Sequence, residues 1–140
     1  MSGNGQAMRD FDAWSKSLKN FTWLADSVPG ATDLDVFIER RGQFFVLETK
    51  AYSVGSGVRV PFGQCLALKA LSALPEFTVL LVGETDDPDK FYVLNMADRE
   101  PTKIRTQPVW YKTRQFERTT KEGLAIMARC WYEEASSAPR

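Results

Sequence analysis

The chain has 140 residues, 44% of them hydrophobic, and its 18 basic residues balance its 18 acidic ones, so the formal net charge is zero. This length and apolar content are typical of one folded domain with one core. We therefore expect a single domain over residues 1–140 that is frayed at residues 1–6 and 135–140. Every apolar run is far shorter than the roughly twenty residues that a membrane span requires, and the first six residues do not resemble a secretory signal. We expect no membrane association.

Histidine and cysteine, the usual zinc ligands, are scarce. The chain has no histidine, which excludes Ser-His-Asp catalysis, Cys-His catalysis and histidine-based zinc sites. Its two cysteines, Cys65 and Cys130, lie in predicted helices and are too few for a disulfide framework or a four-cysteine zinc site. We interpret them as buried thiols of a cytoplasmic protein. Hydrolytic chemistry in this chain must then use carboxylates, lysine and a hard metal ion.

In chain order, the first predicted element is an amphipathic helix over residues 6–18, whose apolar residues recur at spacings of three and four. A β-hairpin follows, because two apolar runs, residues 36–38 and 44–47, flank a polar turn. Gly42 can supply the positive φ that a tight turn needs. We take Arg41 and Gly42 as the two loop residues, which sets the register of the hairpin.

This register brings four charged residues together at the open end of the hairpin. Asp35 faces Glu48, and Asp33 faces Lys50. Residues two apart on a strand share a face, so all four side chains converge on one side, whereas a slip of one residue would scatter them. Like charges directly opposite each other destabilise a sheet unless something positive lies between them. The hairpin is therefore a candidate site for a divalent cation.

The next helix is expected over residues 61–74, with Pro61 in its first turn. Gln64 lies on the same stripe as Leu68 and Leu71, and a glutamine on a buried face needs a polar partner. Either it faces the charged cluster or it caps a local backbone group, and we favour the first interpretation. Between hairpin and helix, two glycines, at 55 and 57, indicate either backbone amides near a phosphate or a flexible connection.

Two apolar runs, residues 77–83 and 91–95, predict further strands. A last helix can be capped by Thr119 or Thr120, with Glu122 completing a capping box for Thr119. We expect the apolar stripe of this helix to pack on the sheet; it consists of Leu124, Met127, Ala128, Trp131 and Tyr132. From residue 133 we expect a polar tail. The order of elements predicts an α/β domain with a mixed four- to five-stranded sheet flanked by helices.

Residues 90–121 contain eight basic residues and three acidic ones. Such a local excess can follow a phosphate backbone, although a solvated surface explains it equally well. Aromatic residues such as Trp110 in the same segment can contact unpaired bases or anchor the core. The candidate nucleic-acid contacts are Lys103, Arg105, Lys112 and Arg114, together with Arg59 before the second helix.

The spacing of the charged cluster resembles a known signature. Asp35 opening one strand, and Glu48-Thr49-Lys50 ending the next, resemble the motif of the PD-(D/E)XK nuclease superfamily. The local spacing is similar to the NERD branch and to archaeal Holliday-junction resolvases. Leu34 stands where the family name has proline. The resemblance covers residues 31–74.

This resemblance implies a restriction-endonuclease-like core and a metal-dependent nuclease that hydrolyses phosphodiester bonds of DNA. Such an enzyme would act in replication, repair, recombination or a phage context, in a bacterial or host cytoplasm. Asp35 and Glu48 would hold Mg²⁺ or Mn²⁺ with the Thr49 carbonyl, and Asp33 would add a ligand or orient the others. Lys50 and Gln64 would complete the catalytic set.

Two alternatives stay open. In the first, the domain has the nuclease fold but no activity, and it binds DNA or a protein partner, including a second copy of itself. In the second, the charged residues form surface salt bridges on a hairpin and carry no chemistry.

Overall fold

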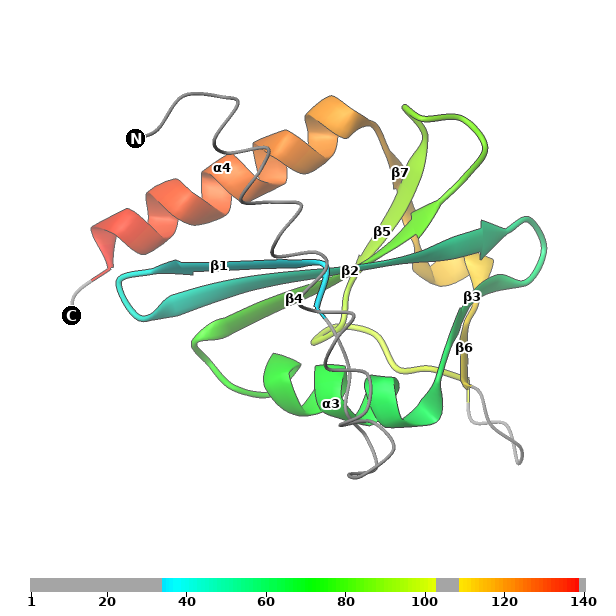
Figure 1. Ribbon diagram of the computed structural model, residues 1–140, viewed down its shortest axis with the longest axis horizontal. Helices are drawn as coiled ribbons and strands as arrows, with labels where there is room; N and C mark the ends of the chain where they lie inside the picture. Colours follow the sequence, from blue (N-terminus) through cyan, green and yellow to red (C-terminus); the bar gives the residue numbers. More distant parts are fainter. Residues whose placement is uncertain (1–33, 103–108, 139–140) are drawn as a thin grey trace, which may run out of the picture. The chain divides into compact units, whose positions relative to one another are not determined.

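The computed structural model describes residues 34–102 and 109–138, which all belong to the unit Asp33–Arg140. This part of the chain is a mixed α/β fold with seven strands in one curled sheet, two α-helices and one turn of 3-10 helix (Figure 1). The strands are β1 (Val36–Arg40), β2 (Gln43–Ser53), β3 (Gly57–Val60), β4 (Phe77–Glu84), β5 (Phe91–Asn95), β6 (Val109–Tyr111) and β7 (Glu117–Thr119). The helices are α3 (Phe62–Ser72), α4 (Lys121–Ser137) and the 3-10 turn η1 (Thr113–Gln115).

The predicted hairpin and its register are confirmed. Arg40 pairs with Gln43 and Val36 with Leu47, so Arg41 and Gly42 form the two-residue loop. Both loop residues have positive φ, 53° and 80°, as the tight hairpin turn with two left-handed residues requires. The side chain of Glu39 stabilises the turn because its carboxylate accepts the Gly42 N–H at 2.8 Å.

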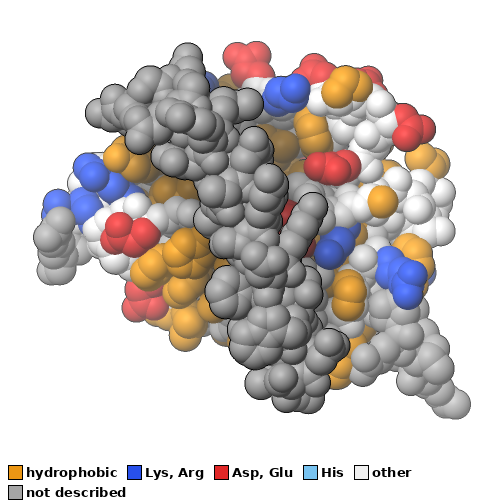
Figure 2. All heavy atoms as spheres, in the orientation of Figure 1, with side chains coloured by type: hydrophobic (Ala, Val, Ile, Leu, Met, Phe, Trp, Pro, Cys, Tyr) orange, Lys and Arg blue, Asp and Glu red, His pale blue; other side chains and the backbone are white. Residues whose placement is uncertain are grey.

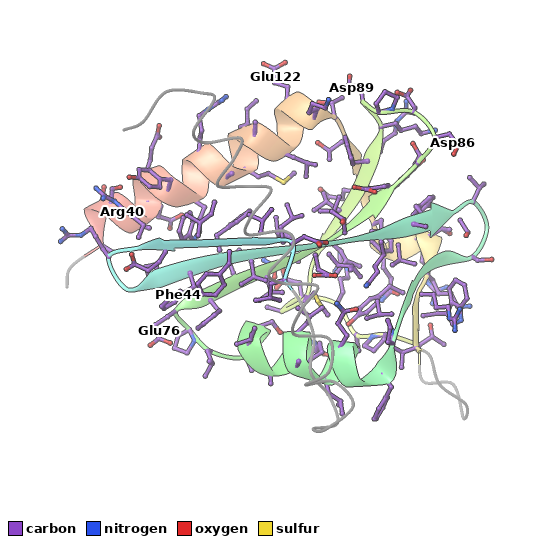
Figure 3. All side chains as sticks on the ribbon, in the orientation of Figure 1. Arg40, Phe44, Glu76, Asp86, Asp89 and Glu122 are labelled. Carbon is purple, nitrogen blue, oxygen red and sulfur yellow. The ribbon has the colours of Figure 1, made fainter. Side chains whose placement is uncertain are left out.

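The hairpin turn is also attached to the end of α4 (Figure 3). The Nε of Arg40 donates to Ser136 Oγ at 2.9 Å, and its guanidinium lies 4.9 Å from the centre of the Tyr132 ring. A cation over an aromatic face is attracted by the ring quadrupole. The loop that determines the register is therefore stabilised within the hairpin by Glu39 and from outside it by α4.

Strand β2 is the centre of the sheet. It runs parallel to β4 along one edge, from Phe44 to Ala51. Its other edge is divided, because β1 pairs with residues up to Leu47 and β3 pairs only with Tyr52 and Ser53. Beyond β4 the order is β5 and then β7, and beyond β3 it is β6. The expected sheet of four to five strands was too small, since β3, β6 and β7 were not predicted.

The two helices cover opposite faces of the sheet (Figure 1). The α3 face encloses the larger cluster of buried side chains, which includes Val46, Val58, Val60, Leu68, Leu81 and Tyr111. On the other face, Leu124, Met127, Ala128 and Trp131 of α4 pack against Phe45, Leu80, Val82 and Val93. The predicted stripe of α4 is thus confirmed for four of its five residues. Tyr132 is the exception, because it is 44% exposed and lies beside Arg40.

The N-terminal end of α4 has one of the two expected caps, and its C-terminal end differs from the expectation. Thr120 is the N-cap and its hydroxyl accepts the Gly123 N–H at 3.0 Å, so the Thr120 alternative is confirmed and the capping box of Thr119 and Glu122 was wrong. The helix continues to Ser137, and Ala135 is only 4% exposed. The segment expected to be a frayed polar tail is therefore helical to that point, since Ala135 provides one more buried contact.

Gly57 begins a strand and is not part of a flexible connection. Its φ is 96°, and a Cβ at this position would collide with the carbonyl oxygen of Tyr111. Only glycine allows both the left-handed conformation and this close approach of β3 to β6. The flexible-linker interpretation of Gly57 is therefore wrong, and the residue has a packing role in the sheet.

Candidate active site

The candidate site lies where the edge of β2 divides. Strand β1 leaves β2 after Leu47 and β3 joins it at Tyr52, so neither strand pairs with residues 48–51 on that edge. We call this gap the fork. Glu48, Thr49 and Lys50 lie in the fork, and α3 approaches it from one face.

Glu48 is the buried carboxylate of the fork, with 4% of its surface exposed. Its Oε1 accepts a hydrogen bond from Gln64 Nε2 at 2.9 Å and lies 3.3 Å from Lys50 Nζ. Its other oxygen, Oε2, is buried and has no hydrogen-bond partner among the described residues. Burial of a polar atom without a partner is costly and rare in folded proteins, so this oxygen needs an explanation.

The charge of Glu48 is correspondingly unfavourable. Burial is the largest cause that raises the pKa of Glu48, and the negative charge of Asp35 raises it further. Lys50 and Gln64 oppose these two effects only in part. The pKa is therefore raised above its ordinary value, as expected for two neighbouring carboxylates, with burial contributing more than the like charge.

Asp35 lies just outside the last pair of the β1–β2 ladder. Its Oδ2 accepts two hydrogen bonds from Thr49, one from the N–H and one from the hydroxyl, both at 2.7 Å. The carboxylate thus takes the strand-edge N–H that a backbone carbonyl would take if the ladder continued. Asp35 is near Glu48, as the register predicted, but it is bound to the edge of β2.

Gln64 lies on the stripe of α3 that faces the sheet and is 9% exposed. Its amide donates to Glu48, so the interpretation in which it faces the charged cluster is confirmed, and the local backbone cap is not formed. A glutamine at this position of the helix satisfies one oxygen of a buried carboxylate and fixes its orientation.

Of the candidate nucleic-acid contacts, the structure describes Arg59, Lys112 and Arg114. Glu48, Lys50 and Tyr52 share one face of β2, and Tyr52 pairs with Val58 of β3. Arg59 is the next residue, so it lies on the opposite face of the sheet, where it pairs with Trp110. Lys112 and Arg114 lie at the start of η1 and within it. Asp33, Lys103 and Arg105 lie outside the described residues.

An aromatic pair that the sequence did not indicate follows Lys50 on its own face. Tyr52 and Tyr92 stack with ring centres 3.8 Å apart and an interplanar angle of 6°. The stack forms because Gly83 has no side chain, and a Cβ there would approach Tyr52 to 2.9 Å. Both tyrosines line a groove of about 580 Å³ that also contains Lys90 and the acids Glu84, Asp86 and Asp87. The sequence could have indicated this neighbour, because Tyr52 stands two residues after Lys50 and residues two apart on a strand share a face.

The donors in the fork are all oxygens. Among the described residues, no group of three or more Asp, Glu, Cys or His side chains is placed to hold a metal ion. The fork itself supplies Glu48 Oε2, the Asp35 carboxylate and the main-chain carbonyl of Thr49. The N–H and C=O of one strand residue point to the same edge, so this carbonyl lies on the side where Thr49 N–H meets Asp35. One or two carboxylates supplemented by waters is the donor set that Mg²⁺ accepts, so the residues present fit a hard cation.

The chain matches no family model, no curated protein and no solved structure. None of the helices in the described residues is both long and apolar enough to cross a membrane.

Proposed function

We propose that the protein is a metal-dependent nuclease of the restriction-endonuclease-like type, which hydrolyses phosphodiester bonds of DNA. The observation that carries the proposal is Glu48 Oε2, which is buried in the fork and has no hydrogen-bond partner in the part of the chain that the structure describes. A second carboxylate, Asp35, lies near enough to raise the pKa of Glu48. Two carboxylates held together at a cost suggest that a cation belongs between them.

Each residue of the fork has a role in this proposal. Glu48 and Asp35, with the Thr49 carbonyl, would hold Mg²⁺ or Mn²⁺, and Asp33 is a further candidate ligand. Such an ion lowers the pKa of a bound water and counters charge on the phosphate oxygens. Lys50 is 25% exposed in its side chain, so its ammonium can reach substrate while it stays paired with Glu48. It would orient the attacking water or stabilise negative charge that develops on the phosphate. Gln64 keeps Glu48 in position.

DNA contacts would come from local basic groups. On the described part of the face in Figure 2, basic and acidic side chains are interspersed, so the surface there has no large field of one sign. We propose Arg59 and the basic segment with Lys103, Arg105, Lys112 and Arg114 as groups that bind phosphates. In a fourfold alanine variant of that segment, the slope of log K against log salt should fall by roughly one for each phosphate that the variant no longer neutralises. An unchanged slope would assign the segment to ordinary surface.

The alternative is a nuclease-fold domain without activity that binds DNA or a protein partner. One observation favours it: Asp35 has two hydrogen bonds to Thr49, and Glu48 pairs with Lys50, so part of the cluster is stable without an ion.

The deciding experiment incubates the protein with labelled single-stranded, duplex and branched DNA and with RNA, in Mg²⁺ or Mn²⁺. Cleavage of DNA that a chelator abolishes supports the nuclease. Retention of DNA without cleavage under every metal condition supports the inactive domain. Cleavage that persists in the chelator would contradict a metal-dependent mechanism.

A further inference from the structure

We propose that the side chain of Thr49 is a positioning residue for the metal site, because its hydroxyl holds one oxygen of Asp35 and leaves the other for the cation. This inference rests on the proposed function. It adds a role for a side chain that the sequence pattern treats as variable, since only the carbonyl of Thr49 was expected to take part.

The geometry distinguishes Thr49 from its neighbours. Its Oγ1 and its N–H both donate to the same oxygen, Asp35 Oδ2, at 2.7 Å. These two bonds are the hydrogen bonds that the described residues give to the Asp35 side chain. Asp35 is exposed and lies before the first residue of β1, so sheet pairing does not hold it. Two donors on one oxygen are therefore what restricts the rotation of this carboxylate.

The two donors differ in what they require from the sequence. Any residue except proline at position 49 supplies the N–H, whereas the hydroxyl requires threonine or serine. Hydrogen bonds to an ionised carboxylate are shorter and stronger than neutral ones, and a carboxylate that ligates a metal is usually oriented by such a partner. The hydroxyl of Thr49 can supply this orientation from the face of β2 opposite to Glu48, where it does not compete for Oε2.

The test compares Thr49→Val, which keeps the shape and removes the hydroxyl, with Thr49→Ser, which keeps the hydroxyl. Mn²⁺ affinity is measured by calorimetry on the full chain, without substrate. Loss of an orienting partner of a metal ligand typically weakens binding by roughly ten- to a hundredfold. We expect that loss for Thr49→Val and a change within about threefold for Thr49→Ser.

Thr78→Val is the matched control. Thr78 is also half-buried, and it lies on the same face of the sheet, opposite Phe45 in the β2–β4 ladder. The described residues give its side chain no hydrogen bond. Its substitution should leave the Mn²⁺ affinity unchanged. Equal loss in Thr78→Val and Thr49→Val, or equal loss in the serine and valine variants, would overturn the inference.

A double mutant separates positioning from a general effect on the fold. In an Asp35→Asn background the ligand is already absent. Adding Thr49→Val should therefore weaken Mn²⁺ binding by less than about twofold relative to Asp35→Asn alone. An undiminished effect in that background would show that Thr49 does not act through Asp35. If wild-type protein binds no Mn²⁺ at all, the metal site itself fails. If wild type binds and Thr49→Val binds equally well, only the role of Thr49 fails.

Discussion

Two lysine–glutamate pairs lie at α3: Lys69 of the helix pairs with Glu100, and Lys50 pairs with Glu48, which Gln64 of the helix contacts. They differ in how many of their buried polar atoms have hydrogen-bond partners. Near the C-terminal end of the helix, Lys69 Nζ donates to the carbonyls of Met96 and Arg99, at 2.8 and 3.2 Å, and lies 2.6 Å from Glu100 Oε1. An ammonium has three donors, so this group is fully used. Near the other end, Glu48 Oε1 has two partners and Oε2 has none among the described residues.

The difference separates a structural cluster from a functional one. Lys69 joins the helix to the chain that follows β5, and Glu100, at 77% side-chain exposure, gives little of that stability. Folding alone selects for polar groups with partners, whereas a site that must receive a ligand keeps a group without one. If the distinction holds, variants of the fork and of the Lys69 cluster should respond differently to metal and to pH.

The largest effect is expected for Lys50→Met in the cleavage assay. Removal of one electrostatic contact to a transition state typically costs roughly a hundred- to a thousandfold in rate. Because Lys50 cannot ligate a cation, the variant should still bind Mn²⁺, while loss of the ammonium beside buried Glu48 should lower the metal-free unfolding midpoint. Lys121→Met, an exposed lysine at the start of α4, is the control and should cleave like wild type. Normal turnover in Lys50→Met would refute its catalytic role.

The second prediction uses metal-dependent stability. A ligand that binds only the folded state stabilises it by about 2.7 kcal/mol at a hundredfold excess over Kd, so Mn²⁺ should raise the melting temperature of the wild type. Asp35→Asn removes both a ligand and the charge that opposes Glu48, so its metal-free melting temperature should hold or rise while its metal increment shrinks. A full increment in Asp35→Asn, or none in the wild type, would exclude the fork as the metal site.

The third prediction concerns the satisfied cluster. Lys69→Met leaves the carbonyls of Met96 and Arg99 without their charged donor, which should lower the free energy of unfolding by about 1–3 kcal/mol. Urea unfolding measures this loss. Any increment from Mn²⁺ should stay as large as in the wild type, because Lys69 does not contact the fork. A smaller increment would show that the two clusters are not independent.

The sequence predicted the elements that have a strong local signal. The loop glycine and the alternation around it were sufficient for the register of the hairpin, and the spacing of Gln64, Leu68 and Leu71 placed Gln64 against the site. Strands β3 and β6 were missed because each has only three or four residues and their pairing joins segments far apart in the chain. Such short strands carry almost no periodicity, and long-range pairing decides them.

The prediction of the site was limited in the same way, because it depends on where strands end and on the missed strand β3. The register correctly brought Asp35 close to Glu48, but the bond from Asp35 to Thr49 depends on how the ladder ends, which no spacing rule describes. The face of Arg59 was unpredictable without β3, because one residue of register moves a side chain to the other side of the sheet.

The smallest effect is expected in the pH dependence of the metal-free protein. Because the pKa of Glu48 is raised by burial and then by Asp35, folded Glu48 keeps its proton to a higher pH than in the unfolded chain. The folded state then binds more protons above the ordinary value of 4.5, so this residue lowers stability as pH rises from there. Each unit of pKa difference between the two states corresponds to about 1.4 kcal/mol.

Glu48→Gln keeps the shape and the bond from Gln64 but cannot ionise. In a chelator, its stability relative to wild type should therefore rise as pH increases above 4.5 and then level off once folded Glu48 is also ionised. Urea unfolding at a series of pH values measures the difference, and Glu122→Gln, an exposed glutamate on α4, gives the effect of removing a charge in general. Saturating Mn²⁺ should reverse the order at neutral pH, because only the wild type has the ligand. A difference that is the same at every pH, with and without Mn²⁺, would mean that Glu48 is as well satisfied as Lys69, and the contrast between the two clusters would fail.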